Sequence, residues 1–212
     1  MTEYEIASAI ENYVTSHRGV TDFPLAQLQV RDEVNTLRLR LFDELEKGNN
    51  SIYNIAPYTQ TITVLPKREN GGMFVDIPYI HVRGSGKVAA DFIGSASGDT
   101  PFKIVTGDRR VWAQYDTHTG KAPTAVYNNG RLEFLNTAPR KVLISAVFNK
   151  PSELRKYGYD WKNTQYPVPY SVIDTIIGKS AESYLRTRQQ TIPHPNNQSD
   201  IDAQGSSQLK VN

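Results

Sequence analysis

The chain has 212 residues, a formal net charge of +2 at pH 7 and no cysteine. The lack of cysteine excludes disulfides, thiolate metal sites and thiol nucleophiles, and the near-zero net charge argues against dedicated sequence-specific binding to nucleic acid. No charged-then-apolar leader opens the sequence and no apolar run reaches the length of a membrane span, so we expect a soluble intracellular product without membrane contact.

The small net charge is unevenly distributed along the chain. Residues 1–50 hold nine acids against five bases, whereas residues 51–150 hold seven acids against twelve bases. An acidic start and a basic middle can attract each other within a molecule or between copies, although ordinary scatter explains the same counts.

The first fifty residues have the pattern of two helices. Thr2 and Glu5 form a capping box, which predicts a helix that ends at Gly19. A second helix is expected from Pro24 to Gly48. Its predicted apolar stripe is Val30, Val34, Leu37, Leu41 and Leu45, with Arg31, Arg38 and Arg40 off that stripe.

Residues 51–148 change to short apolar runs separated by turn residues, which is typical of a small sandwich or barrel. Asn128-Asn129-Gly130 predicts a tight hairpin because these residues tolerate positive φ. The expected strands cover residues 61–65, 73–77, 79–82, 88–93, 102–105, 111–115, 124–127, 131–135 and 142–148.

The end of the chain predicts a closing helix and a polar tail. Pro151 is followed by a short helical turn, and Pro169 stands where a proline starts a helix over residues 170–191. The expected apolar side of that helix is Tyr170, Ile173, Ile177, Tyr184 and Leu185. Residues 192–212 are too polar to fold alone and are predicted to be disordered or ordered by a partner.

Together these patterns predict an α+β fold in which N- and C-terminal helices pack together around an inserted small antiparallel β-sandwich or barrel. We expect a single domain over residues 1–191. Residues 1–50 and 149–191 would be helical and residues 51–148 mainly β.

Two glycine-rich segments imitate active-site motifs. Residues 84–87, Gly-Ser-Gly-Lys, lack the earlier glycine of a phosphate loop, since His81 stands there, and lack its hydroxyl, since Val88 follows. Residues 94–98 resemble a nucleophile elbow, but Ala96 stands at the nucleophile position. Both segments are better explained as turns, and we expect no catalysis and no cofactor.

Two further hypotheses remain open. A small metal-dependent hydrolase would use Asp108, Asp116 and His118 as ligands, although carboxylates on hairpin loops are usually solvated. A nucleic-acid-binding accessory protein would use basic residues of the β region, which alternate with aromatic residues. The candidate partner or DNA contacts are Lys67, Arg68, Arg83, Lys87, Arg109, Arg110 and Lys121, and Lys103 lies among them.

The order of elements resembles a known class of phage proteins. The likeness rests on Ile144-Ser145-Ala146-Val147-Phe148-Asn149-Lys150-Pro151, on Pro167-Val168-Pro169, on the helix at 170–191 with its Asn/Asp-rich end, and on the helix at 31–45. In this layout the chain resembles the head-to-tail connector proteins of short-tailed bacteriophages. These are adaptor, gatekeeper or tail-tube ring subunits and include the ring proteins of crAss-like phages.

The resemblance implies a non-enzymatic virion protein made in the host cytoplasm and placed in the portal and tail region. It implies self-association as a ring of twelve subunits around the DNA channel. The implied partners are the portal, neighbouring tail or ring proteins, and packaged DNA through non-specific contact.

Overall fold

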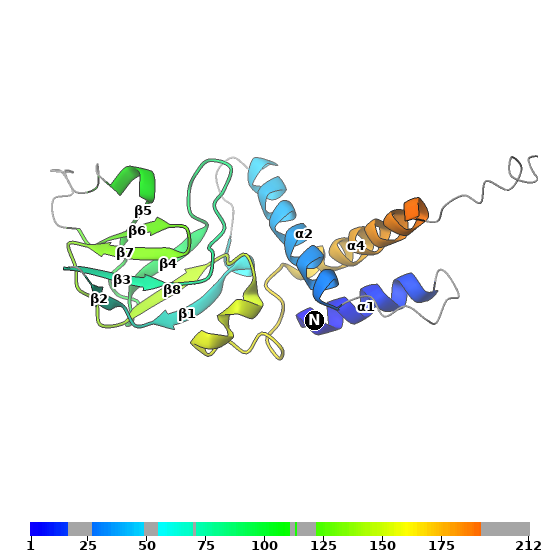
Figure 1. Ribbon diagram of the computed structural model, residues 1–212, viewed down its shortest axis with the longest axis horizontal. Helices are drawn as coiled ribbons and strands as arrows, with labels where there is room; N and C mark the ends of the chain where they lie inside the picture. Colours follow the sequence, from blue (N-terminus) through cyan, green and yellow to red (C-terminus); the bar gives the residue numbers. More distant parts are fainter. Residues whose placement is uncertain (17–26, 49–54, 70, 111–112, 114–121, 192–212) are drawn as a thin grey trace, which may run out of the picture.

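Helices from the two ends of the sequence pack together, and the strands between them form a separate β region (Figure 1). The computed structural model describes residues 1–16, 27–48, 55–69, 71–110, 113 and 122–191. Lys121, Asp116, His118, most of the predicted strand at 111–115 and the whole predicted tail therefore lie outside the described residues. The predicted α+β class, with terminal helices around a central strand region, is confirmed.

Helix α1 (Glu3–Ser16) begins with the predicted capping box. The Thr2 backbone N–H donates to Glu5 Oε2 at 2.8 Å, and the Glu5 N–H donates to Thr2 Oγ1 at 3.2 Å. These two bonds satisfy amides that the first turn of a helix would otherwise leave without partners. The helix then buries Ile6, Ile10 and Val14, which are spaced four residues apart and form one face.

Helix α2 (Gln27–Gly48) buries Val30 and Val34 of the predicted stripe, but its buried face then continues through other positions. Its buried positions Val30, Val34, Arg38 and Phe42 follow one another at intervals of four, whereas Leu45 is 40% exposed. The prediction that Arg38 lies off the stripe is wrong. The α2 ribbon lies between the β region and the other two helices, so it contacts partners on two sides, and one of them supplies carbonyl groups that bind Arg38 (Figure 1).

Helix α4 (Tyr170–Thr191) has the predicted bounds and packs against both α1 and α2. Ile173, Ile176 and Ala181 are buried in its core-facing side. Tyr170 is 77% exposed, so its predicted place on the apolar side is wrong. It lies in the first turn, where the chain has only just left the loop that leads into the helix. This loop follows the 3-10 helix η3 (Pro151–Tyr157), so residues 149–169 are not continuously helical as expected.

The strands form two sheets, of three and five strands among the described residues. The order is β1-β8-β4 in the smaller sheet and β2-β3-β7-β6-β5 in the larger one. The strands are β1 (Gln60–Val64), β2 (Lys67–Glu69), β3 (Gly72–Asp76), β4 (Ala90–Ser95), β5 (Lys103–Thr106), β6 (Thr124–Asn128), β7 (Arg131–Leu135) and β8 (Val142–Ala146).

One pairing departs from the predicted antiparallel arrangement, because β5 and β6 are parallel. Parallel neighbours need a long crossover, and residues 107–123 separate β5 from β6 in the sequence. Two further differences concern single segments. Residues 79–82 make only isolated bridges, Ile80 to Phe148 and Val82 to Val88, and β2 was not predicted. The hairpin at Asn129 and Gly130 is confirmed, with φ of 43° and 81° and the register Asn128–Arg131.

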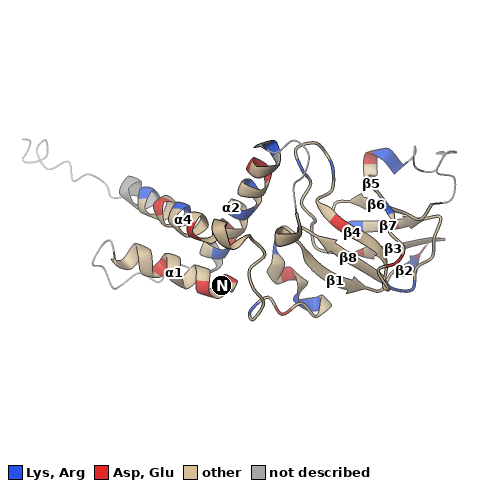
Figure 2. Cartoon of the chain, turned by 180° about the vertical axis from the view of Figure 1, so that it is seen from behind, with Lys and Arg blue, Asp and Glu red and all other residues tan. Residues whose placement is uncertain are grey.

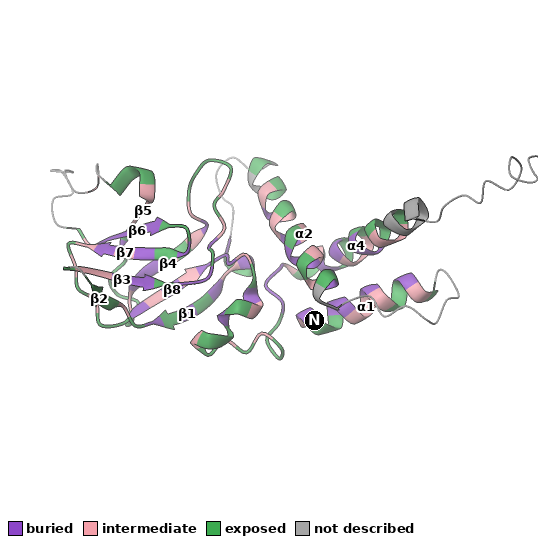
Figure 3. Ribbon diagram, in the orientation of Figure 1, coloured by how far each residue is buried: buried purple, intermediate pink, exposed green. Residues whose placement is uncertain are grey.

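Two clusters of buried side chains stabilise the molecule (Figure 3). One lies among the helices, and the other lies between the two sheets, where Ile144 of β8 and Leu132 of β7 belong to it. Immediately after β8, two consecutive residues belong to different clusters. Val147 belongs to the helical cluster and Phe148 to the sheet cluster, as expected for extended backbone whose side chains alternate.

Polar contacts join α2 to the β region beside these clusters. Arg38 donates from its guanidinium to the carbonyl oxygens of Phe148 and Asn149. His81 Nε2 lies 2.8 Å from Asp43 Oδ1, and Lys150 Nζ lies 2.8 Å from Asp32 Oδ1. Whether residues 1–191 behave as the single domain we expect stays a prediction.

Candidate functional site

The two segments that imitate active-site motifs are turns. Arg83 N–H donates to the Lys87 carbonyl at 2.9 Å and Gly86 N–H donates to the Arg83 carbonyl at 2.8 Å, which closes a hairpin with Gly86 at φ 76°. In the second segment, the Thr100 N–H donates to Ser95 Oγ at 3.0 Å. A Cβ on Gly94 would come within 2.3 Å of the Thr100 carbonyl oxygen, so the glycine is needed for close packing.

The proposed metal ligands are not brought together in the part of the chain that the structure describes. No group of three or more His, Cys, Asp or Glu side chains there could hold a metal ion. Asp108 is exposed in the 3-10 helix η2 (Gly107–Arg109). A hydrogen bond with the Thr106 side chain, helped by the nearby Arg109, holds the pKa of the Asp108 carboxyl below its ordinary value. Asp116 and His118 lie outside the described residues, so the hydrolase stays a hypothesis.

The predicted contact residues divide among three places in the β region. Lysines and arginines occur on the strands, on η2 and on the helices alike (Figure 2). Lys67 and Arg68 are exposed on β2, Arg83 and Lys87 flank the turn at 83–87, and Arg109 and Arg110 lie at the end of η2.

Arg110 belongs to a hollow where positive and negative charges compensate each other. Its guanidinium lies 2.6 Å from Glu133 Oε1. In the same hollow Arg131 lies 3.8 Å from Glu69 and 3.6 Å above the ring of Phe74. Because each arginine faces a carboxylate, this surface carries little net charge, and Arg110 is a poor candidate for a contact with an anion.

Arg83 also has an internal role. Its side chain is partly buried, and its guanidinium carbon lies 5.8 Å from the centre of the Phe42 ring. Phe42 in turn packs edge-on against Tyr58 and His81. Arg83 therefore packs where α2 meets the β region, and its side chain is only partly available to a partner.

Lys87 and Arg109 instead line one groove, which we call the basic groove. It has a volume of about 330 Å³ and runs between the turn at 83–87 and β5. Lys103, at the start of β5, is the third cation in its lining. Among the described residues, the lining consists of Ser85, Gly86, Lys87, Val88, Lys103, Ile104, Val105, Thr106 and Arg109.

The basic groove exists because β5 is the last described strand of its sheet. One edge of β5 pairs with β6, which leaves the other edge facing the turn at 83–87. The sequence identifies Lys87 and Arg109 separately as cations, but their convergence depends on the parallel pairing and the crossover. Alternation in the run 102–105 shows a strand and does not show which strand lies beside it.

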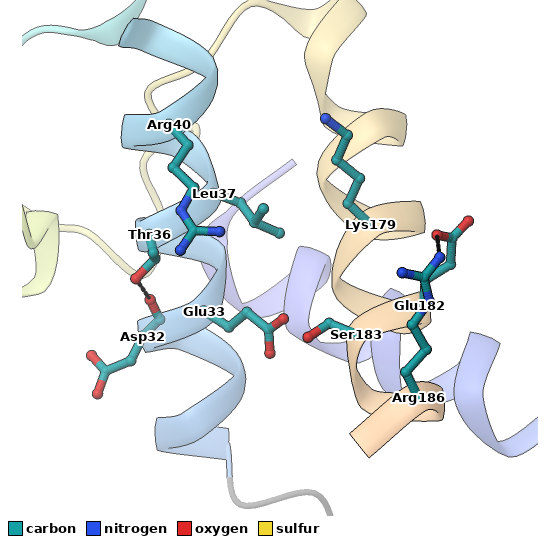
Figure 4. A pocket seen from close by; sticks show the side chains of 9 residues that line it. All are labelled: Asp32, Glu33, Thr36, Leu37, Arg40, Lys179, Glu182, Ser183 and Arg186. Atoms are coloured by element: carbon teal, nitrogen blue, oxygen red, sulfur yellow. Dashed lines mark hydrogen bonds and ion pairs between the residues drawn. The ribbon is translucent and has the colours of Figure 1, made fainter. Parts of the chain in front are cut away.

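A larger cleft of about 640 Å³ lies between α2 and α4 (Figure 4). The Arg40 side chain extends along α2 toward Glu33, whereas the Lys179 side chain extends in the opposite direction along α4, and Glu33 extends toward Ser183. On α4, Arg186 lies 3.6 Å from Glu182. Burial raises the pKa of the Tyr184 hydroxyl on α4, and the carboxylate of Glu33 raises it further. Charged side chains of both signs therefore alternate along the cleft.

A buried polar network lies where α1, α2 and the loop before α4 meet. The Tyr166 hydroxyl donates to Asn35 Oδ1 at 2.9 Å, and Asn35 Nδ2 donates to Glu3 Oε1 at 3.3 Å. Burial raises the pKa of the Glu3 carboxyl, although the positive charges of Arg31 and Arg38 oppose that shift. The network orients three elements relative to one another. Glu3, Asn35 and Tyr166 are not among the described residues that line the basic groove or the cleft between α2 and α4.

Comparison with known proteins adds no relative to this description. No protein-family model matches the chain, and no curated protein matches it. Among the helices that the structure describes, none combines the length and apolar character that crossing a membrane would require.

Proposed function

We propose that the chain is a non-enzymatic virion structural protein, a subunit of a multi-copy ring that joins the capsid portal to the tail around the DNA channel. The observation that carries this proposal is the packing of α1 and α2 with α4, which brings both ends of the described chain into one helical body. The β region then projects from that body as an insertion. This is the layout of the head-to-tail connector proteins that the sequence resembles.

The cleft between α2 and α4 supports a protein partner. Its lining is dominated by charged side chains of both signs, including Arg40, Lys179, Glu33 and Glu182. Sites for small organic ligands are mostly apolar with a few polar groups, so this cleft is better suited to a charged protein surface. In a ring each subunit presents one face to the next subunit and a different face to the previous one, and complementary charge fixes the register.

Assembly of the purified protein tests the ring. Light scattering and negative-stain microscopy would be applied to the chain alone and to the chain mixed with the portal protein of the same genome. We expect closed rings, with twelve copies, that seat on the portal. A protein that stays monomeric and also fails to join portal or tail partners would contradict the proposal.

A charge-reversal variant tests the cleft itself. Arg40→Glu combined with Lys179→Glu should prevent ring closure, because it reverses two of the positive charges that line the cleft, and should leave the thermal unfolding temperature nearly unchanged. Arg68→Glu combined with Arg155→Glu is the matched control, since it makes the same change in net charge on exposed residues of the β region and η3. Equal loss of assembly in both variants would show that the cleft has no special role.

Mass spectrometry of purified virions tests the location independently. The chain should be present with the portal and the tail proteins, at a copy number close to that of the portal. A chain found only in the lysate of infected cells would exclude a structural place in the particle.

A further inference from the structure

We infer that the basic groove binds the phosphodiester backbone of DNA through Lys87, Lys103 and Arg109. The phosphate chemistry rests on the groove alone. The choice of DNA as the polyanion rests on the proposed function, which places this chain beside a DNA channel.

The described lining of the basic groove is positively charged. Of the nine described residues that line the groove, three are cationic and none carries a carboxylate, in a chain whose overall net charge is only +2. Ser85 adds a hydroxyl group that can donate to a phosphate oxygen atom, whereas the Thr106 hydroxyl already bonds the Asp108 carboxylate. Cationic side chains assisted by hydroxyl donors are the groups that position nucleic-acid backbones in proteins.

The three cations of the groove come from three different segments of the chain. Lys87 comes from a turn that two backbone hydrogen bonds hold closed, Lys103 from β5, and Arg109 from η2. Three separate segments therefore hold the charges along one groove. An anion in the groove can therefore contact cationic side chains from all three segments.

The other predicted contact residues of the β region are less suited than Lys87 and Arg109 to bind phosphate in this groove. Arg110 faces Glu133 and Arg131 lies near Glu69, so both are opposed by carboxylates. Lys67 and Arg68 lie on β2, at the opposite edge of the sheet from β5. Of the predicted contact residues within the described chain, only Lys87 and Arg109 line the basic groove.

Asp108 is a described carboxylate that opposes the positive charge of the groove. Asp108 is next to Arg109 in η2, and the two side chains interact electrostatically. It lies outside the groove lining, where it offsets part of the positive charge. Removing the charge of Asp108 should therefore increase affinity for DNA, an effect that disturbance of the fold would not produce.

The test is fluorescence anisotropy of a labelled short duplex DNA over a salt series. The groove variant carries Lys87→Gln, Lys103→Gln and Arg109→Gln. The control carries Lys67→Gln, Arg68→Gln and Arg155→Gln, which removes three exposed charges elsewhere. Thermal unfolding of each variant confirms folding. If the triple variant is unstable, Lys87→Gln and Arg109→Gln are measured singly, since both side chains are exposed.

We expect the groove variant to bind DNA about tenfold more weakly. The plot of log affinity against log salt should also become shallower, with the magnitude of its slope reduced by about two to three, because three phosphate contacts are lost. The control should change affinity by less than about twofold, and Asp108→Asn should raise it by about twofold at low salt. Equal losses in the groove variant and the control, or no loss in either, would overturn the inference.

Competition with pyrophosphate identifies the source of the phosphate. DNA should be displaced only at high pyrophosphate concentration, because a short anion fills a small part of a backbone site. If pyrophosphate binds as tightly as the duplex, the groove is a small-phosphate site and the assignment to DNA is wrong. Ring formation is measured separately. Rings without DNA binding would leave the proposed function intact, whereas DNA binding without rings would favour the accessory-protein hypothesis.

Discussion

The guanidinium of Arg38, in the middle of α2, donates a hydrogen bond to the backbone carbonyl of Phe148, just beyond the end of β8. The Arg38 side chain is 0% exposed. Burial lowers its pKa, whereas interactions with Tyr166 and Glu3 favour the charged form. An arginine stays protonated in such a site, so a positive charge is part of the contact between the helices and the β region.

Replacing Arg38 should destabilise the fold strongly. Arg38→Ala is expected to lower the free energy of unfolding by about 3 kcal/mol or more, because it removes the donor to two carbonyl groups and a positive charge that favours the ionised Glu3 carboxyl. Arg38→Met should cost less, since it fills the space of the side chain. Arg40→Ala, on the exposed side of the same helix, should change stability by less than about 0.5 kcal/mol. Urea denaturation of the variants measures all these differences.

The raised pKa of Glu3 gives a dependence of stability on pH. A carboxyl whose pKa is higher in the folded state than in the unfolded chain binds its proton more tightly when folded. Its contribution is therefore most favourable below the unfolded pKa and is lost as the pH rises through the folded pKa. Glu3→Gln cannot titrate at this position and serves as the reference. The free energy of unfolding of the unsubstituted protein should rise relative to that of Glu3→Gln as the pH falls from neutral. Parallel pH profiles of the two proteins would contradict this.

The buried face of α4 gives a stability prediction with an internal control. Ile176→Ala should destabilise the protein by about 2–5 kcal/mol, because it leaves a cavity in the helical cluster. Ile173→Asp should prevent folding or assembly, since it places a charge in the same cluster. Tyr170→Ala, at the exposed start of the helix, should change the free energy of unfolding by less than about 0.5 kcal/mol. Thermal unfolding distinguishes these outcomes.

Two glycines with positive φ separate backbone strain from side-chain collision. Gly130 and Gly98 have φ of 81° and 82°, so an alanine at either position should cost about 1–2 kcal/mol. A Cβ at Gly130 would also lie 3.0 Å from the Ile77 carbonyl oxygen, whereas nothing lies within 4 Å at Gly98. Gly130→Ala should therefore be the more damaging change in chemical denaturation. An equal loss at both positions would mean that the β region yields to the added methyl group.

The features that the sequence predicts correctly are those that neighbouring residues determine. Thr2 and Glu5 bond each other across one helical turn, Asn129 and Gly130 adopt the φ values their types favour, and α4 starts after Pro169 as expected. Each of these signals acts over a few residues. Local signals also identify both glycine-rich segments that imitate active-site motifs as turns.

The features that the sequence does not predict depend on distant segments. Arg38 looks like an exposed residue until the carbonyl of Phe148, 110 positions away, is placed beside it. The parallel position of β5 depends on its crossover, and the basic groove depends in turn on β5. The sequence predicts Tyr170 on the apolar side of α4, but its side chain is exposed. Helical spacing gives the relative angles of the side chains and does not show which face meets the core.

The alternation of Val147 and Phe148 restricts how the length of this chain can change. These neighbours enter different clusters because extended backbone turns successive side chains to opposite sides. One residue inserted after Ala146 would exchange them, so that each would point into the space shaped for the other. An insertion of two would restore the sides but move the carbonyl that Arg38 holds. The number of residues between β8 and η3 is therefore fixed by both clusters at once, and lengthening or shortening the chain at this junction should disrupt one of them.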